Sequence, residues 1–98
     1  MDKKQIESFI NALGETIEKR NDNSVTVVYQ RIDTTQRKII DYSCDGNCIE
    51  FMFENGCTII PFNLIENMEY YYKENEDSYY FKIVLRNENG TITYCLII

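Results

Sequence analysis

Aromatic and acidic side chains are concentrated in one stretch of this 98-residue chain, between residues 66 and 80. Five of the eight tyrosines lie there, on either side of an acidic turn. Tyrosine combines a large apolar ring with a polar hydroxyl, which suits a surface that binds a partner yet stays hydrated. We therefore predict that this stretch is a hairpin that contacts another protein. The candidate partner-binding residues are Glu66, Glu69, Tyr70, Tyr72, Glu74, Glu76, Asp77 and Tyr79.

Other uses of the same stretch remain open from the sequence. Carboxylates at phosphate-like spacing can occupy a basic channel and so mimic a nucleic acid, whereas an acidic hairpin tip can also serve only to keep the chain hydrated. Exposed tyrosines can stack single-stranded bases. The local basic group that would favour RNA is small, namely Arg31, Arg37 and Lys38. We therefore expect a protein partner with a basic surface and regard nucleic acid as the less favoured partner.

Catalytic chemistry has little support in the composition. The chain has no histidine, which removes the usual general base and both the Ser-His-Asp and the Cys-His arrangements. The four glycines are scattered at positions 14, 46, 56 and 90, so no glycine-rich phosphate loop is present.

Paired carboxylates act as a general acid and base only in a pocket that raises the pKa of one of them. Most acidic residues here alternate with apolar residues, as on the solvated face of a strand. We expect no enzyme activity, no catalytic residues and no cofactor. The carboxylates considered for a catalytic pair are Glu50, Glu54, Glu66 and Glu69.

The four cysteines allow three interpretations. Cys44 and Cys48 form a C-x3-C pair across a tight turn, and Cys57 and Cys95 would complete a four-thiolate zinc site. Zinc sites more often use C-x2-C, and the other two cysteines do not form a second close pair. A disulfide across the turn is the second interpretation, which a reducing compartment disfavours. We expect plain thiols and no metal, with Cys57 and Cys95 buried in strands.

The net charge restricts the partners further. The chain has 16 acidic and 10 basic residues and a formal net charge of −6. Such a surface disfavours non-specific binding to phosphate backbones and favours a basic protein surface. No apolar run approaches the roughly 20 residues of a membrane span, and the N-terminus lacks the apolar core of a signal peptide. We therefore expect a cytoplasmic protein without membrane contact.

The N-terminal segment is predicted to form an amphipathic helix over residues 3–20, because its apolar residues recur at the steps of one helix face. Asp2 can cap its start, and Lys19 and Arg20 complement the negative C-terminal end. Gly14 weakens the helix slightly but allows close approach to the sheet. The apolar positions are Ile6, Phe9, Ile10, Leu13 and Ile17.

The rest of the chain changes to the period of two that is typical of strands. We expect a first strand from residue 25, a turn at residues 33–36 and a second strand over 37–44. Asp-Gly at 45–46 and Asn-Gly at 55–56 and 89–90 are strong hairpin signals because these residues tolerate positive φ. A single helical turn is predicted within 62–67. Further strands are expected over residues 48–54, 57–61, 68–73, 79–86 and 91–97.

About seven short strands joined by hairpin-length connections predict an antiparallel sheet, and twist and edge protection favour strong curvature. We expect one α+β domain over residues 1–98. It comprises an N-terminal helix and loop over 1–22, packed on a strongly curved antiparallel sheet or small β-barrel formed by a β meander over 23–98. Residues 95–98 are expected to be a paired, buried strand, or else an exposed edge that supports a homodimer. The predicted core is Phe51, Phe53, Ile59, Phe81, Ile83, Leu85, Tyr94 and Leu96.

Residues 49–72 resemble the Sm-like or SH3-like small β-barrel. The apolar pattern from Ile49 to Glu54, the turn at Asn55-Gly56 and the strand that ends at Pro61 carry this resemblance, which implies ring formation and RNA binding. In size and charge, the chain is also similar to phage or mobile-element inhibitors, including anti-CRISPR proteins, and to toxin-immunity proteins. We expect a small, acidic, non-enzymatic protein-binding module that acts as an inhibitor or adaptor. The alternative is an Sm-like oligomeric nucleic-acid-binding or scaffold protein.

Overall fold

The computed structural model describes residues 2–29 and 33–98 of the chain and begins with helix α1 (Lys3–Arg20), as predicted. The Asp2 carboxylate accepts a hydrogen bond from the backbone N–H of Lys4 and so caps the start of the helix. Asn21 ends the helix with a φ of 53°, a left-handed conformation that asparagine tolerates. Among the described residues, no helix has the length and apolar character that a membrane span requires. The buried face of α1 comprises Ile6, Phe9, Ile10, Leu13 and Thr16.

In the described part of the chain, seven strands follow and form one antiparallel sheet in the order β4-β3-β2-β1-β7-β6-β5, which does not close into a barrel. β4 and β5 are consecutive in sequence, with the short 3-10 helix η1 (Phe62–Leu64) between them, but they lie at opposite edges. The expected meander is therefore interrupted once, and the pairing of β1 with β7 joins its two parts. The strands are β1 (Ser24–Tyr29), β2 (Asp33–Cys44), β3 (Cys48–Phe53), β4 (Gly56–Pro61), β5 (Ile65–Lys73), β6 (Ser78–Asn87) and β7 (Gly90–Ile97).

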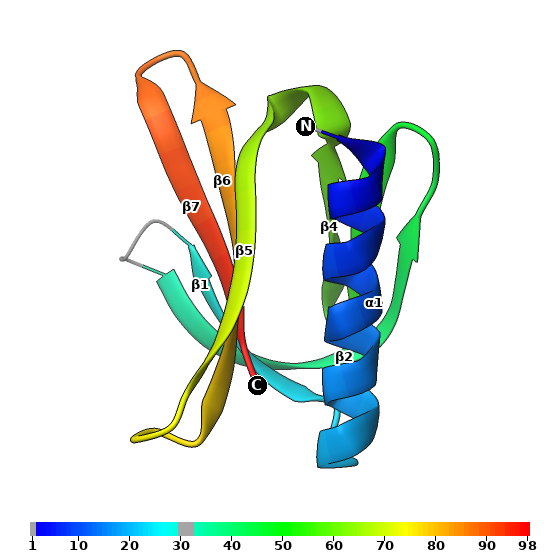
Figure 1. Ribbon diagram of the computed structural model, residues 1–98, viewed down its shortest axis with the longest axis vertical. Coiled ribbons are helices and arrows are strands. Elements are labelled where there is room, and N and C mark those ends of the chain that lie inside the picture. Colours follow the sequence, from blue (N-terminus) through cyan, green and yellow to red (C-terminus); the bar gives the residue numbers. More distant parts are fainter. Residues whose placement is uncertain (1, 30–32) are drawn as a thin grey trace.

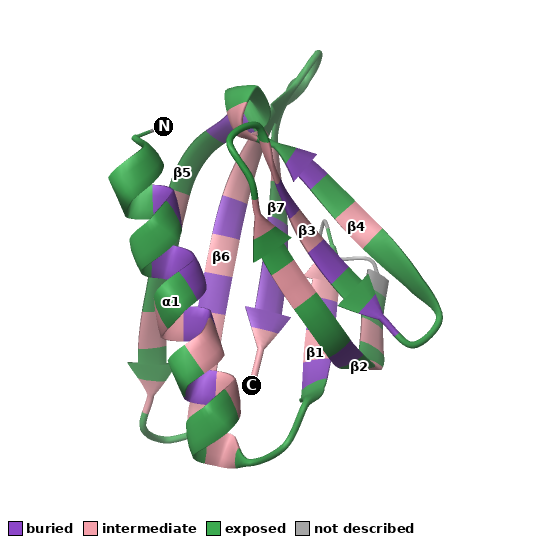
Figure 2. Ribbon diagram, turned by 90° about the vertical axis from the view of Figure 1, so that its right-hand side faces the viewer, coloured by how far each residue is buried: buried purple, intermediate pink, exposed green. Residues whose placement is uncertain are grey.

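The sheet curves around α1, as Figure 1 shows. The helix contacts β5 and β6, and its buried face is turned toward the sheet (Figure 2). The expected close approach at Gly14 is present, because a Cβ atom there would lie 2.2 Å from the hydroxyl oxygen of Tyr42 in β2. The helix therefore lies across the concave face of the sheet, and the α+β fold with a curved sheet is confirmed.

The core fills the space between α1 and the concave face of the sheet. The prediction for Ile59 is wrong, because this side chain is 56% exposed. Ile59 lies opposite Glu50 in the β3–β4 register, and alternation along the strand turns it to the outer face while its neighbour Ile60 points inward. Leu85 is half-buried against the core. The other predicted core residues are buried, namely Phe51, Phe53, Phe81, Ile83, Tyr94 and Leu96.

The turn predicted at residues 33–36 is also wrong. These residues begin β2 and pair with β1, for example Thr35 with Val27. The β-branched threonines favour an extended strand, and this preference outweighs the turn tendency of a single aspartate. Residues 30–32, and with them Arg31 of the predicted basic group, lie outside the described residues.

The C-terminal segment forms a paired strand in the interior of the sheet, as expected. β7 lies between β1 and β6. The Ile98 N–H donates to the Tyr79 carbonyl at 2.9 Å, and the Tyr79 N–H donates to the Ile98 carbonyl at 2.8 Å. The two edges of the sheet are therefore β4 and β5 rather than the C-terminal strand.

Candidate functional site

The predicted contact surface is the hairpin of β5 and β6. The strand register places Tyr71 opposite Tyr80 and Tyr72 opposite Tyr79. Because successive strand residues point to opposite faces, the two pairs lie on different sides of the sheet. Tyr72 and Tyr79 lie on the concave side with α1, whereas Tyr71 and Tyr80 lie on the convex side.

Tyr70 and Tyr72 are the most exposed aromatic residues of the hairpin, at 50% and 45% exposure. The ring of Tyr70 stacks on Phe81 with a centroid distance of 5.7 Å, and it meets Phe9 of α1 edge-on at 6.3 Å. These contacts fix one side of the Tyr70 ring while the other side stays open to solvent. A ring that is fixed by its neighbours and half open has the geometry of a binding anchor.

A cluster of hydrogen bonds joins the hairpin turn to the C-terminal end of α1. The Nη2 atom of Arg20 donates to the backbone carbonyl of Asp77 at 2.6 Å and to its carboxylate at 3.2 Å. The Tyr72 hydroxyl donates to the same carboxylate at 2.6 Å, and Nζ of Lys19 donates to the Tyr79 hydroxyl at 3.0 Å. The hydrogen bond from Tyr72, followed by that from Arg20, holds the pKa of Asp77 below its ordinary value. Asp77 is thus paired within the molecule and fixes the turn against the helix.

Tyr71 and Tyr80 form a separate aromatic pair on the convex face. Their rings are parallel with centroids 5.3 Å apart, and Lys82 lies over Tyr71 while Lys73 lies over Tyr80. The Tyr80 hydroxyl donates a hydrogen bond to Glu76, which raises the pKa of Tyr80 to about 12. Neither ring belongs to the predicted contact residues.

Two adjoining hollows lie between α1 and β5 and share Tyr70 and Lys4 in their lining. We call them together the α1–β5 groove. Two carboxylates of α1, those of Glu7 and Glu15, line this groove with the single ammonium of Lys4. Glu69 adjoins Tyr70 at the edge of the groove, but its side chain points to the convex face, opposite Lys82. The groove is therefore acidic, with an aromatic ring in its wall. Its lining residues are Lys4, Gln5, Glu7, Ser8, Phe9, Asn11, Ala12, Glu15, Met68, Glu69 and Tyr70.

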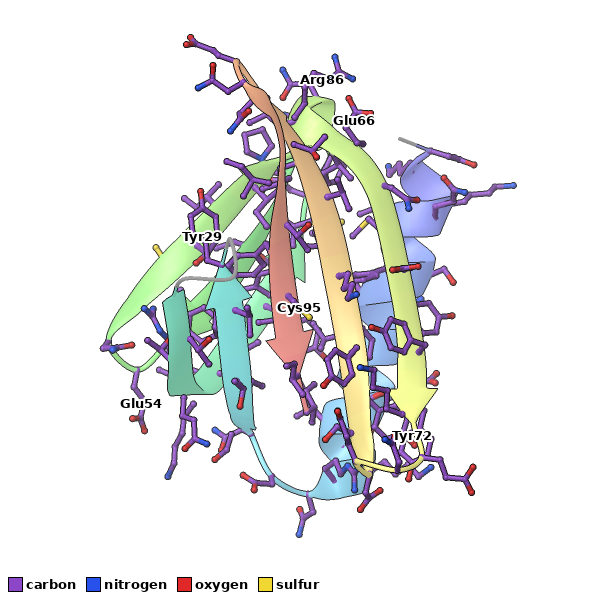
Figure 3. The ribbon with its side chains drawn as sticks, turned by 90° about the vertical axis from the view of Figure 1, so that its left-hand side faces the viewer. Tyr29, Glu54, Glu66, Tyr72, Arg86 and Cys95 are labelled. Atoms are coloured by element: carbon purple, nitrogen blue, oxygen red, sulfur yellow. The ribbon has the colours of Figure 1, made fainter. Side chains whose placement is uncertain are left out.

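The predicted contact residues are divided among several places. Tyr70 lines the groove, and Tyr72 lies two residues further along the same face of β5. Glu69 adjoins Tyr70 at the strand edge, but its side chain points to the convex face. Glu66 lies at the other end of β5 from Tyr72, where it forms an ion pair with Arg86 (Figure 3). Glu74 and Glu76 are exposed at the turn, and Asp77 and Tyr79 face the end of α1.

Sequence reasoning missed the carboxylates that α1 contributes. Glu7 and Glu15 lie eight residues apart on the exposed side of the helix, a spacing that returns to about the same face. The helical period of the sequence was therefore sufficient to predict that Glu7 and Glu15 share one face of the helix. Nothing in the sequence places this face beside β5, because the docking of a helix against one particular strand is a tertiary property.

The cysteines do not converge. All four are free thiols, and within the described part of the chain no three histidine, cysteine or acidic side chains are placed to hold one metal ion. The four-thiolate zinc arrangement is therefore not formed. The thiols of Cys44 and Cys48 both approach Asp45, with sulfur–oxygen distances of 3.8 Å and 3.7 Å. Burial raises the pKa of Cys44 and Cys95, whereas Cys57 is exposed on the edge strand β4, contrary to expectation.

The carboxylates considered for acid–base chemistry fall into two groups. Glu50 lies in β3 and Glu54 follows this strand directly, whereas Glu66 and Glu69 belong to β5. Four strands separate β3 from β5 in the sheet order. The fold therefore does not bring the two groups together through neighbouring strands.

Comparison of the chain with protein-family models, with curated proteins and with solved structures finds no match in any of the three. The assignment of a function therefore rests on the geometry and chemistry of the chain itself.

Proposed function

We propose that the protein is a non-enzymatic binding module, an inhibitor or adaptor, which docks a basic segment of a partner protein in the α1–β5 groove. The observation that carries this proposal is the half-exposed ring of Tyr70 beside the carboxylates of Glu7 and Glu15. Aromatic side chains held in place at a groove are typical binding hot spots. Tyr70 is thus the anchor, and Tyr72 is a second aromatic contact. We place the module in the cytoplasm, because four free thiols suit a reducing compartment.

The charge of the groove selects the chemistry of the partner. Glu7 and Glu15 outnumber the one ammonium of Lys4, and the whole chain has a net charge of −6. Opposite charges speed the encounter and fix the orientation of a partner. A segment rich in lysine or arginine therefore fits the groove, whereas a phosphate backbone is repelled.

The hairpin tip has a supporting role in this proposal. Glu74 and Glu76 extend the acidic surface beyond Tyr72. Asp77 and Tyr79 hold the turn against the end of α1, and so they set the position of the strand that carries the anchor. Their substitution is expected to weaken binding through loss of this positioning.

The proposal is tested by capture from nuclease-treated lysate of the source organism, read by mass spectrometry. Three immobilised proteins are compared: the unmodified chain, a groove variant, and a control that lacks the same number of carboxylates elsewhere. We expect one partner to be retained by the unmodified protein and the control and lost from the groove variant. Equal retention by the groove variant would refute the proposal. The groove variant combines Glu7→Gln and Glu15→Gln, and the control combines Glu50→Gln and Glu54→Gln.

An Sm-like nucleic-acid-binding or scaffold protein is the second candidate. The stacked rings of Tyr71 and Tyr80, each with a lysine over its face, are the feature that favours it, since nucleobases stack on such platforms. Each lysine also has an acidic neighbour: Lys73 lies 4.0 Å from Glu76, and the residue opposite Lys82 is acidic as well. This pairing weakens the attraction for phosphate. The test is RNA binding at low salt by the unmodified protein and by a variant with both lysines replaced by glutamine. If the unmodified protein binds RNA and the variant does not, this second proposal replaces the first.

A homodimer through an edge strand is the remaining partner proposal. The two edges differ, because β5 carries Glu66, Glu69 and Lys73, whereas β4 has no charged side chain and exposes 56% of Ile59. Charged edges discourage strand addition and uncharged apolar edges invite it. We therefore expect a second copy to pair at β4. Light scattering should give the mass of a dimer for the unmodified protein and of a monomer for Ile59→Lys, and a monomeric unmodified protein would contradict this.

A further inference from the structure

A second concave site lies away from the α1–β5 groove, between the edge strand β4 and strands β1, β2 and β7. It is a cavity of about 400 Å³, and we call it the β4 cavity. Its size falls in the usual range for small-molecule sites, roughly 300–1,000 Å³. Tyr29, which Figure 3 labels on β1, and Tyr94 of β7 contribute two aromatic rings to its lining. The two rings meet edge-on with centroids 6.3 Å apart.

The lining of the β4 cavity combines an apolar body with a few polar groups. Val27, Ile60 and Leu85 contribute aliphatic surface. The hydroxyls of Thr58 and Tyr94 lie 3.4 Å apart, and this separation is longer than that of a typical hydroxyl hydrogen bond. Each hydroxyl is therefore able to form a better hydrogen bond with a third group that lies beside the pair.

Arg37 contributes a guanidinium to the lining of the β4 cavity. Its Nε donates to the hydroxyl of Thr35 at 3.1 Å, and the guanidinium lies over the ring of Phe53 at 5.5 Å. These contacts orient the fork and leave the two Nη groups for another acceptor. Arg20 and Arg86 each pair with a carboxylate, but Arg37 does not within the described residues.

We propose that the β4 cavity binds a small, mainly apolar ligand that bears one carboxylate, with the carboxylate on Arg37. A planar guanidinium fork matches the two oxygens of a carboxylate. Arg37 supplies one positive charge to the lining, and the chain as a whole has a net charge of −6. A ligand with a single negative charge is therefore favoured over a phosphate dianion. The aliphatic residues and the two tyrosine rings would enclose the apolar body. This site is independent of the proposed protein-binding groove.

The experiment titrates 15N-labelled protein with naphthoate and with naphthamide, two probes that differ only in the carboxylate. We expect amide shifts at cavity-lining residues and an affinity for naphthoate at least about tenfold higher, as a charge-assisted hydrogen bond implies. Arg37→Gln should abolish this preference. Lys38→Gln should keep it, because the adjacent residue points to the opposite face of β2.

A cavity-filling variant provides a second and independent test. Thr58→Leu places a larger apolar side chain in the wall of the cavity and should weaken both probes by a similar factor. Equal affinity of the unmodified protein for the two probes would overturn the proposal, and so would a preference for naphthoate that survives Arg37→Gln. The absence of shifts at the cavity amides up to millimolar naphthoate would also overturn it. Dispersed amide spectra of each variant without probe show that the fold is kept.

Discussion

Phe9→Ala is expected to destabilise the protein strongly, because Phe9 is a fully buried side chain through which α1 packs on the hairpin. Phe9 is 1% exposed, and its ring meets Phe81 edge-on with a centroid distance of 5.5 Å. Replacement of a buried phenylalanine by alanine costs about 3–5 kcal/mol, which includes the cavity that is left. The aromatic pair accounts for about 0.5–1.5 kcal/mol of this loss. A domain of this size has a stability of roughly 5–15 kcal/mol, so the loss is a large fraction of the total.

Urea unfolding followed by circular dichroism measures this effect. With a slope of about 2 kcal/mol/M, a loss of about 4 kcal/mol lowers the midpoint by about 2 M. Phe9→Leu, which keeps most of the apolar volume, should lose less than about 1.5 kcal/mol. The exposed helix residue Gln5 offers a control, and Gln5→Ala should change stability by no more than about 0.5 kcal/mol. If Phe9→Ala lowered stability no more than this control, α1 would not be packed in the concave face and the α1–β5 groove would not exist.

Three further predictions concern titration and thiol reactivity. Because the pKa of Asp77 is lowered from its ordinary value of 3.8, its contribution to stability is present above that value and is lost as the pH falls through the lowered pKa. Asp77→Asn should therefore reduce the acid sensitivity of the unfolding midpoint below about pH 4, and unchanged acid sensitivity would contradict the Arg20–Asp77–Tyr72 cluster. An alkaline absorbance titration should show one phenol with a pKa of about 12 that disappears in Tyr80→Phe, and its persistence would assign it to another tyrosine. Exposed Cys57 should react first with a thiol reagent and buried Cys95 last, so an unchanged fast phase in Cys57→Ser would show that the cysteine exposures are wrong.

Local patterns in the sequence were sufficient for most of the elements. The helix follows from its apolar period, and the Asn-Gly turns are confirmed by glycine φ values of 154° at Gly56 and 126° at Gly90. The turn expected at residues 33–36 fails because cross-strand pairing with β1 extends β2 through this segment. Ile59 fails as a core residue because apolar character alone does not fix which face of an edge strand is buried.

The candidate site was predictable only in part. Tyr70 and Tyr72 are recognisable from composition, but alternation separates them from Glu69, Tyr71 and Tyr80 only once the strand register is known. The charge of the hairpin tip is partly offset by Arg20, which comes from the end of α1, 57 residues earlier. Neither the α1–β5 groove nor the β4 cavity has a local signature, because each is formed by elements that meet only in the folded chain.

The measurement that tests the protein-binding proposal most directly is the affinity of the captured partner for Tyr70→Ala and Tyr71→Ala, determined side by side by calorimetry. These neighbouring tyrosines point to opposite faces of β5, so the pair separates the groove from the convex face. Loss of a binding anchor costs about 2 kcal/mol or more, or roughly thirtyfold in Kd. We predict such a loss for Tyr70→Ala and a change of less than about threefold for Tyr71→Ala. A larger loss for Tyr71→Ala, or no loss for Tyr70→Ala, would contradict the assignment of the α1–β5 groove as the binding site.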